Sequence, residues 1–297
     1  MKRVLIVVVL VISAATLGLW RSNSGIRQGL SRAVSSSEDV QGQPREEIRK
    51  SFELQPGARI EVAGINGKVD IQTSDTHTAE VYVLRTAKTQ DGLKRREVTI
   101  EQTSNGIIIK TKQVGHGFWE HIFGSKAKED VTIKAPRQIA LALRGINGRV
   151  TGGDIDGALE AKGINGHVDL GQATESAELS GINGNISVTL NKLGSRGARL
   201  SGINGGIELK LAADLNADLT AKGMNGSLRS EIAGVTVNKG DYGSNYSARI
   251  GDGGAPITMS GINGNVRLTQ ATIASTASDK KPSNQKQEKV DAGVSKD

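Results

Sequence analysis

Most of the chain alternates apolar and polar residues with the two-residue period of a half-buried β-strand. The clearest alternating segments are RIEVAG, KVDIQT, EVYVLRT, EVTIEQ, GIIIKTK and DVTIKAP. Ser104-Asn105-Gly106, between two of these segments, is a typical turn sequence. Beyond the N-terminal apolar segment, no window keeps a helical period over ten or more residues. The pattern therefore predicts an all-β fold.

A tetrapeptide, Gly-Ile-Asn-Gly or its Met variant, recurs seven times in the alternating region. Its asparagines are Asn66, Asn147, Asn165, Asn183, Asn204, Asn225 and Asn263. The intervals between them are 81, 18, 18, 21, 21 and 38 residues. A period of about 20 residues is typical of a solenoid, a propeller or an array. Because the last interval is roughly two repeats long, we expect one degenerate repeat within residues 226–262.

Two β-structures compete to explain the tetrapeptide. If Asn183-Gly184 forms the type I′ turn of a hairpin, Ile182 lies on the polar face of that hairpin. The other copies would do the same, so a large apolar residue would face water seven times out of seven. If each repeat is instead one coil of a β-solenoid, the tetrapeptide is a corner and Ile182 points into the core. The solenoid is the favoured interpretation.

In the solenoid, each residue of the corner has a separate task. Asn183 or Gly184 takes the left-handed conformation that turns the chain, and Gly181 lets neighbouring backbones approach closely. Coils stack about 4.8 Å apart, so the successive asparagines from 147 to 225 would form a ladder of side-chain amides. We expect these hydrogen bonds to be buried, each worth about 1 kcal/mol. The prediction is a right-handed parallel β-solenoid with coils of about 20 residues.

The N-terminus indicates export. Lys2 and Arg3 precede an uncharged apolar stretch from Val4 to Trp20, which is typical of a signal peptide or of a single membrane anchor. In both cases the positive-inside rule places the rest of the chain outside the cytoplasm. We therefore expect a periplasmic or cell-surface protein, tethered to the membrane by a helix in this segment.

The composition divides the remaining chain into a body and two polar ends. The body is the β-solenoid, residues 51–270, with irregular, longer coils over 51–129 and regular repeats over 130–270. Residues 21–50 form a polar linker, with one short helix near Pro44 to Lys50. Residues 271–297 contain too little apolar surface to offset the entropy of ordering, which predicts a disordered tail.

Charge and cysteine content exclude several classes of function. The net charge is +7, yet residues 51–270 carry 25 basic and 23 acidic groups. A nucleic-acid groove needs clustered Lys and Arg with stacking aromatics, and Lys94-Arg95-Arg96 is a short run that a solvated loop explains. We expect no nucleic-acid partner. Cysteine is absent, which excludes disulfides, thiolate metal sites and a cysteine nucleophile.

No catalytic motif emerges from the sequence. It contains no nucleophile elbow, phosphate loop or His-Glu-x-x-His motif. Asp154 and Asp156 in GGDIDG would share one face of a strand, with Asp169 one coil away, and could bind calcium. Solvent-facing turn residues are the favoured interpretation. We therefore expect no catalytic residues, no cofactor and no metal, and a protein that is not an enzyme.

The segment GHGFWEHIFG, residues 115–124, interrupts the rhythm of the repeat. Phe118, Trp119, His121 and Phe123 make it rich in apolar and aromatic side chains, as in a loop that docks a partner, a glycan or the membrane face. The favoured alternative is a cap that covers an open end or one side of the solenoid. A metal site formed by its two histidines and Glu120 is a weaker interpretation.

The recurrent Asn-Gly followed by an alternating strand, as in RGINGRVTGG and SGINGNISVTL, resembles the bacterial envelope family known as "putative adhesins". This is a domain of unknown function with β-strand repeats, and the resemblance covers residues 51–270. It implies a β-helix-like fold and an exported location, and it supplies no catalytic residues.

The combined expectation is a non-enzymatic envelope scaffold or adhesin-like binding module, with an envelope protein or a glycan as its partner. One alternative is a carbohydrate-active enzyme on a β-helix. A second is a membrane-anchored accessory of an envelope-stress or signalling system.

Overall fold

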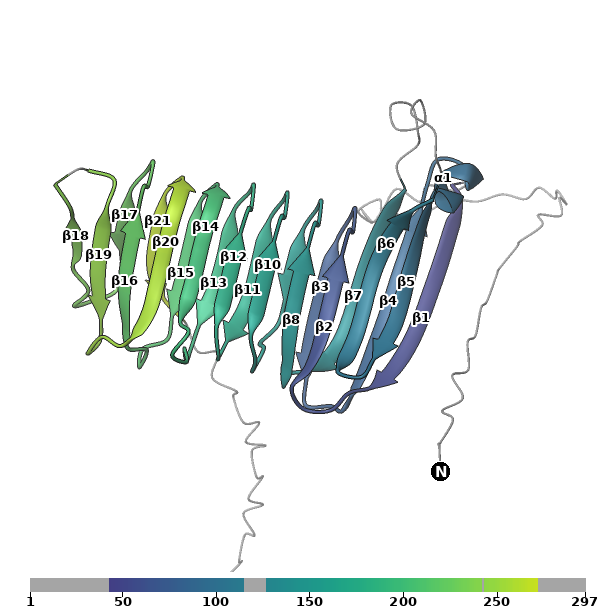
Figure 1. Ribbon diagram of the computed structural model, residues 1–297, viewed down its shortest axis with the longest axis horizontal. Coiled ribbons are helices and arrows are strands. Elements are labelled where there is room, and N and C mark those ends of the chain that lie inside the picture. Colours follow the sequence, from purple (N-terminus) through teal and green to yellow (C-terminus); the bar gives the residue numbers. More distant parts are fainter. Residues whose placement is uncertain (1–42, 115–126, 242, 272–297) are drawn as a thin grey trace, which may run out of the picture.

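The computed structural model describes residues 43–114, 127–241 and 243–271. These residues form two large β-sheets that face each other across one apolar core (Figure 1). Sheet A has ten strands, in the order β1 (Arg45–Glu53), β4 (Thr78–Thr86), β7 (Lys128–Pro136), β3 (Val69–Ser74), β9 (Val150–Gly152), β11 (Val168–Ala173), β13 (Ile186–Leu190), β15 (Ile207–Leu211), β21 (Val266–Gln270) and β17 (Leu228–Ser230).

Sheet B has eleven strands, in the order β18 (Val237–Lys239), β19 (Tyr246–Ile250), β16 (Ala217–Lys222), β20 (Ala255–Asn263), β14 (Ala198–Asn204), β12 (Ala177–Ser180), β10 (Leu159–Lys162), β8 (Ile139–Arg144), β2 (Ala58–Ala63), β6 (Gly106–Gln113) and β5 (Arg96–Thr103). Most neighbours are parallel, and antiparallel pairs occur towards the two ends of the stack. This is the all-β, mostly parallel arrangement expected of a β-solenoid, and its handedness stays a prediction.

One regular coil consists of a strand in sheet B, a corner tetrapeptide and a strand in sheet A. β12, the corner at 181–184 and β13 make one such coil, and it pairs in register with the coils on both sides. Strand alternation sends Leu179, Val188 and their equivalents inward, where they are fully buried. Ile182 of the corner is 1% exposed. The predicted inward-facing corner is confirmed.

The two glycines of each corner exchange the tasks predicted for them. Gly181, rather than Asn183 or Gly184, takes the left-handed conformation, with φ of 60°. A Cβ added at Gly181 would meet nothing closer than 3.7 Å. Gly184 has φ of 149°, and a Cβ there would lie 2.0 Å from the carbonyl oxygen of Gly166 in the next coil. The close approach of backbones therefore depends on the second glycine, and the turn depends on the first.

The seven asparagines form one ladder along the corners, in the order Asn66, Asn147, Asn165, Asn183, Asn204, Asn263 and Asn225. Each Nδ2 donates to the Oδ1 of the preceding asparagine at 3.0–3.4 Å. The ladder itself is confirmed. The expectation of burial is wrong, because all but Asn66, which is half-buried, are exposed. The inward isoleucine holds the corner, and the asparagine lies on its outer side.

The last coil of the chain is inserted between two coils that precede it in sequence. β20 lies between β14 and β16, and β21 lies between β15 and β17. Asn263 therefore separates Asn204 from Asn225, and the predicted direct stacking of the latter two is wrong. The predicted degenerate repeat within 226–262 is also wrong, because the residues between β17 and β20 form β18 and β19, which pair antiparallel instead of adding a coil. β19 pairs antiparallel with β16, and the chain then enters β20, which lies between β14 and β16.

The N-terminal end of the stack has a different corner. β6 and β7 pair parallel to β2 and β3, so they form an outer coil whose connecting residues 115–126 lie outside the described part. The Glu129 carboxylate accepts hydrogen bonds at this end of the stack. Its Oε2 accepts from the Asn66 backbone N–H at 3.0 Å, and its Oε1 accepts from Arg96 Nε at 2.7 Å. The Asn66 side chain completes the ladder by donating to the carbonyl of Ala127 at 2.9 Å.

The predicted polar linker ends too late. β1 begins at Arg45, so residues 45–50 are a strand and the expected short helix near Pro44 to Lys50 is wrong. The helix in the described part is α1 (Gln90–Lys94), whose Leu93 packs in a small apolar cluster with Ala87 and Ala127, separate from the main core. None of the described helices is long and apolar enough to cross a membrane. The predicted helix in residues 1–20, the rest of the linker and the tail from 272 lie outside the described residues.

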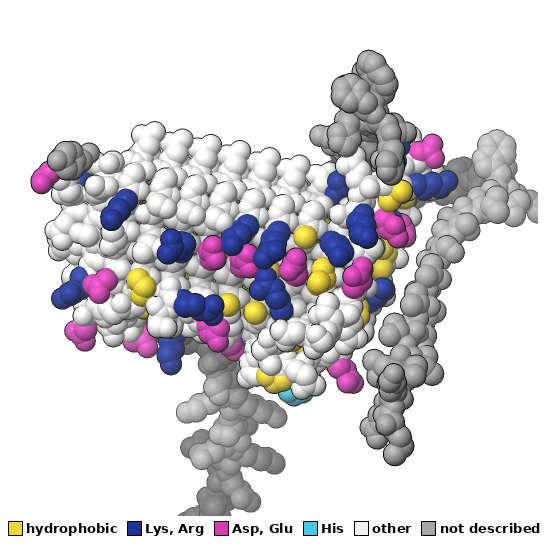
Figure 2. Space-filling view, in the orientation of Figure 1, with side chains coloured by type: hydrophobic (Ala, Val, Ile, Leu, Met, Phe, Trp, Pro, Cys, Tyr) yellow, Lys and Arg dark blue, Asp and Glu magenta, His cyan; other side chains and the backbone are white. Residues whose placement is uncertain are grey.

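The outer face of sheet B is held by ion pairs. Glu160 accepts hydrogen bonds from Arg59 and Arg144, both at 2.9 Å, and lies 3.1 Å from Lys162. Burial alone would raise the pKa of Glu160, but the bonds from Arg59, Lys162 and Arg144 lower this pKa to about 2. Figure 2 shows basic and acidic side chains interspersed on the face that it presents. The Glu160 carboxylate is thus satisfied by the cations around it.

Candidate functional site

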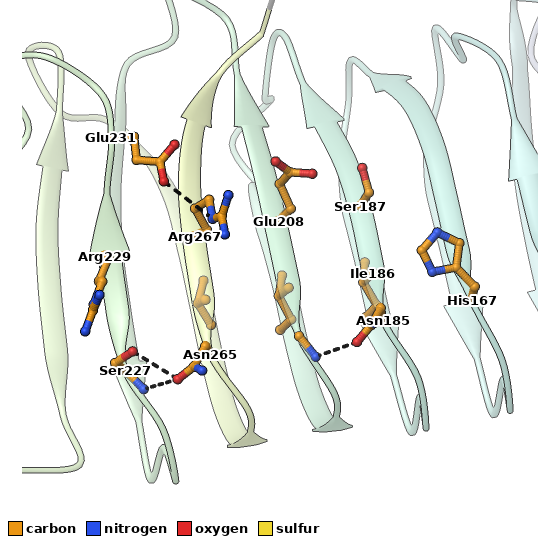
Figure 3. Close-up of a pocket in the computed structure, with 13 residues that line it drawn as sticks. His167, Asn185, Ile186, Ser187, Glu208, Ser227, Arg229, Glu231, Asn265 and Arg267 are labelled. Carbon is orange, nitrogen blue, oxygen red and sulfur yellow. Dashed lines mark hydrogen bonds and ion pairs between the residues drawn. The ribbon is translucent and has the colours of Figure 1, made fainter.

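A hollow of about 640 Å³ lies on the outer face of sheet A, over β11, β13, β15, β21 and β17 (Figure 3). We call it the polar hollow. Its polar lining includes His167, Asn185, Ser187, Glu208, Asn265 and Arg267. The last two come from the inserted coil, so the site is complete only when β21 lies between β15 and β17.

The depth of the hollow follows from one variable position in the repeat. The residue after each Asn-Gly faces outward from sheet A, because the next residue is buried in the core. Along the stack these residues are Lys68, Arg149, His167, Asn185, Gly206, Asn265 and Ser227. The side chains shorten from the long cations at one end to Gly206 and remain short beyond it. A notch therefore opens over β15.

Two asparagine amides flank this notch with only one side of each amide engaged. Asn185 Oδ1 accepts from the Gly206 N–H at 3.0 Å. Asn265 Oδ1 accepts from Ser227, from the backbone N–H at 3.1 Å and from Oγ at 3.0 Å. The Nδ2 groups point away from these bonds (Figure 3). Neither Nδ2 has a hydrogen-bond partner among the residues that the structure describes. Both are donors available to a ligand.

Ser187 is an unsatisfied group in the floor of the hollow. It is 9% exposed and lies between Asp169 and Glu208 of the adjacent coils. Its Oγ is buried, and within the described part of the chain it has no hydrogen-bond partner. Thr151, in the same row of the sheet, instead donates to Asp70. That pair lies in a second hollow of about 540 Å³ on this face, where the hydroxyl is already used.

The charges around the polar hollow balance. Two carboxylates, Glu208 and Glu231, face two guanidinium groups, Arg229 and Arg267. Arg267 Nε lies 3.5 Å from Glu231 Oε1, and both side chains are about 60% exposed. Such an exposed pair contributes little stability and leaves both groups accessible. The lining therefore contains amide and guanidinium donors, carboxylate acceptors and two hydroxyls, those of Ser187 and Ser227, and its two carboxylates and two guanidinium groups carry no net charge.

The predicted calcium alternative finds no support in the geometry. Asp154 and Asp156 follow β9 instead of sharing a strand, and both lie within 3.6 Å of the Arg137 guanidinium. Asp169 pairs in register with Thr151, not with either of them. Over the described ranges, no three His, Asp or Glu side chains form a group that could hold a metal ion. The expected placement of this pair on one strand face is wrong.

The structure does not test the predicted partner-binding loop. Phe118, Trp119, His121 and Phe123 lie outside the described residues.

The polar hollow was not predicted from the sequence. Its signal is the variable residue after each Asn-Gly, which shrinks to Gly206 and then stays small. The contribution of Asn265 and Arg267 has no such signal, because it depends on the inserted coil.

Comparison with known proteins adds a likeness in fold. No protein-family model matches the sequence, and no curated protein matches it. A "putative cell adhesion protein" from Clostridium sporogenes is 9% identical, with a TM-score of 0.36, covering 76% of this chain and 100% of that chain. A "putative adhesin" from Bacteroides fragilis is 11% identical, with a TM-score of 0.34, covering 75% of this chain and 97% of that chain.

A similar protein from Parabacteroides merdae, with the same description, is 12% identical and has a TM-score of 0.24, over 75% of this chain and 96% of that chain. These are bacterial proteins of the kind that the repeat resembles. Because all three TM-scores lie below 0.5, the likenesses add no argument for function.

Proposed function

We propose that the chain is an exported, membrane-tethered and non-enzymatic binding module on a right-handed β-solenoid, and that it binds an envelope component at the polar hollow. The observation that carries the proposal is the contrast between the two faces. On sheet B, the Glu160 carboxylate is satisfied by Arg59, Arg144 and Lys162. Among the described residues, the Nδ2 groups of Asn185 and Asn265 and the Ser187 hydroxyl in the polar hollow on sheet A have no hydrogen-bond partner.

The second candidate is a carbohydrate-active enzyme. It is favoured by one observation, that Glu208 and Glu231 line the same hollow. Glycoside hydrolysis uses two carboxyl groups, one of which stays protonated as a general acid. Glu231 is instead paired with Arg267, and Glu208 lies 4.0 Å from Lys210. Each carboxyl group therefore already has a cation as a neighbour, an arrangement that suits a hydrogen-bonding surface better than acid catalysis.

Filling the notch tests the proposal without disturbing the fold. Gly206 has room for a side chain, since an added Cβ would lie 3.4 Å from its nearest neighbour, Asn185 Oδ1. Arg149 already occupies the equivalent position of another coil. We expect the full-length chain to sediment with purified bacterial cell walls in a saturable manner, and Gly206→Arg to abolish this. Ser260→Arg, exposed on sheet B of the inserted coil, is the matched control and should bind normally.

Release of soluble fragments in the same assay separates the two candidates. The binding module retains the walls without releasing reducing ends. Steady release that Glu208→Gln or Glu231→Gln removes would establish the enzyme instead. Equal binding by Gly206→Arg and the unmodified chain would show that the hollow is not the site.

A further inference from the structure

The ligand class can be inferred from the groups that line the polar hollow. A polyanion would need clustered Lys and Arg, and a cationic partner would need unpaired carboxylates. The hollow has two charged groups of each sign. It fits instead a neutral ligand with many hydroxyl groups, each of which can both donate and accept a hydrogen bond.

The spacing of the two asparagine Nδ2 donors indicates how such a ligand lies relative to the strands. Asn185 and Asn265 immediately precede β13 and β21, which pair in register with β15 on its two sides, so the notch lies between the two asparagines. Adjacent strands are about 4.8 Å apart, so the two amides are roughly 10 Å apart along the stack. This separation is comparable to the length of a disaccharide unit. One chain of sugars lying across the strands can therefore meet both Nδ2 groups.

We propose that the polar hollow binds a neutral oligosaccharide that crosses β13, β15 and β21. Sugar oxygens accept hydrogen bonds from Asn185 Nδ2 and Asn265 Nδ2. A sugar hydroxyl donates to the Glu208 carboxylate. The coil that contains Asn265 supplies one of the two donors, so its insertion completes the binding site. This inference rests on the proposed function, and it specifies the ligand of the same hollow.

Asparagine-to-aspartate substitutions isolate the two donors. Asn185→Asp and Asn265→Asp keep an oxygen for the Gly206 and Ser227 bonds and replace the Nδ2 donor with a negatively charged acceptor. Asn216→Asp introduces the same charge outside the hollow, at an exposed amide that accepts from the Asp252 N–H. It serves as the matched control.

Calorimetric titration of the full-length chain in detergent with three defined probes tests the inference. The probes are chitotetraose, cellotetraose and tetragalacturonate. We expect saturable binding of one or both neutral tetrasaccharides. Asn185→Asp and Asn265→Asp should each weaken it about tenfold, as for the loss of one hydrogen bond in a binding site. Gly206→Arg should abolish binding, and Asn216→Asp should leave it unchanged. Preference between the two neutral probes distinguishes an N-acetylated source from an unmodified one.

Four outcomes overturn the inference in distinguishable ways. Tighter binding of tetragalacturonate than of the neutral probes contradicts the neutral class. Unchanged affinity in both aspartate variants contradicts binding of the ligand through the two asparagine amides. Retention on cell walls that Gly206→Arg removes, without binding of any tetrasaccharide, contradicts the oligosaccharide and leaves the proposed function intact. If the unmodified chain binds neither cell walls nor any tetrasaccharide, both proposals are wrong.

Discussion

Gly184→Ala is expected to destabilise the solenoid by about 3 kcal/mol or more. Its Cβ would lie 2.0 Å from the backbone oxygen of Gly166, and the backbone φ of 149° is rarely adopted by residues other than glycine. The backbone atom cannot move aside without opening the bonds between two coils. In a domain of this size the unfolding midpoint should fall by roughly 6–12 °C, measured by circular dichroism during heating.

Two neighbouring positions in the same corner provide the controls. Gly181→Ala meets no close atom and should lose about 1–2 kcal/mol from its left-handed conformation alone. Asn183→Ala removes ladder bonds that lie at the surface, so it should lose about 1 kcal/mol or less. The order of effects is the test. A midpoint for Gly184→Ala at or above that of Gly181→Ala would contradict the close approach of the coils.

Glu129→Ala should destabilise the N-terminal end of the stack by about 3–5 kcal/mol, the range for breaking a buried ion pair. The Glu129 side chain is completely buried, and Arg96 is 24% exposed. Removal of the carboxylate leaves the Asn66 backbone N–H and the Arg96 guanidinium without their partner. Urea denaturation followed by circular dichroism measures the loss.

A double-mutant cycle separates the ion pair from other effects of this substitution. Arg96→Ala alone leaves the buried carboxylate without its cation, and the double variant removes both charges. We expect the double variant to lose less stability than the sum of the two single losses. Glu178→Ala removes a carboxylate from an exposed pair with Lys162 and should have a small effect. Additive losses would show that Glu129 does not act through Arg96.

The inward face of the corner could be predicted because it follows from side-chain chemistry. An apolar residue seven times out of seven between two glycines has one reasonable location, the core, and Ile182 is there. The division of labour between Gly181 and Gly184 could not be predicted in the same way. Both lack a side chain, and only the backbone of the adjacent coil distinguishes the glycine that turns from the glycine that needs space.

The order of the coils in the stack could not be predicted from the intervals between the repeats either. The interval from Asn204 to Asn225 equals the one before it, so the sequence predicts direct stacking. In the structure the coil of Asn263 fills a slot between them, and nothing local to either asparagine indicates it. The polar hollow depends on this slot, since Asn265 and Arg267 enter with the inserted coil. The complete site therefore could not be predicted from the sequence. Only the small residues after two of the Asn-Gly pairs, Asn185 and Gly206, can be recognised there.

Engineered cysteine pairs test the insertion of the last coil, on which the polar hollow depends. Ser201, Ser260 and Lys222 occupy one row of sheet B, on β14, β20 and β16. Adjacent Cα atoms in such a row are about 4.8 Å apart, which suits a disulfide, and atoms two strands apart are roughly 10 Å apart, which does not. The natural chain has no cysteine to interfere.

Mild oxidation of the folded chain, read by mass spectrometry after proteolysis, gives the answer. We predict that the Ser201→Cys, Ser260→Cys variant forms its disulfide and that the Ser201→Cys, Lys222→Cys variant does not. The reverse result would place β14 directly beside β16. It would contradict both the inserted coil and the binding site that this coil completes.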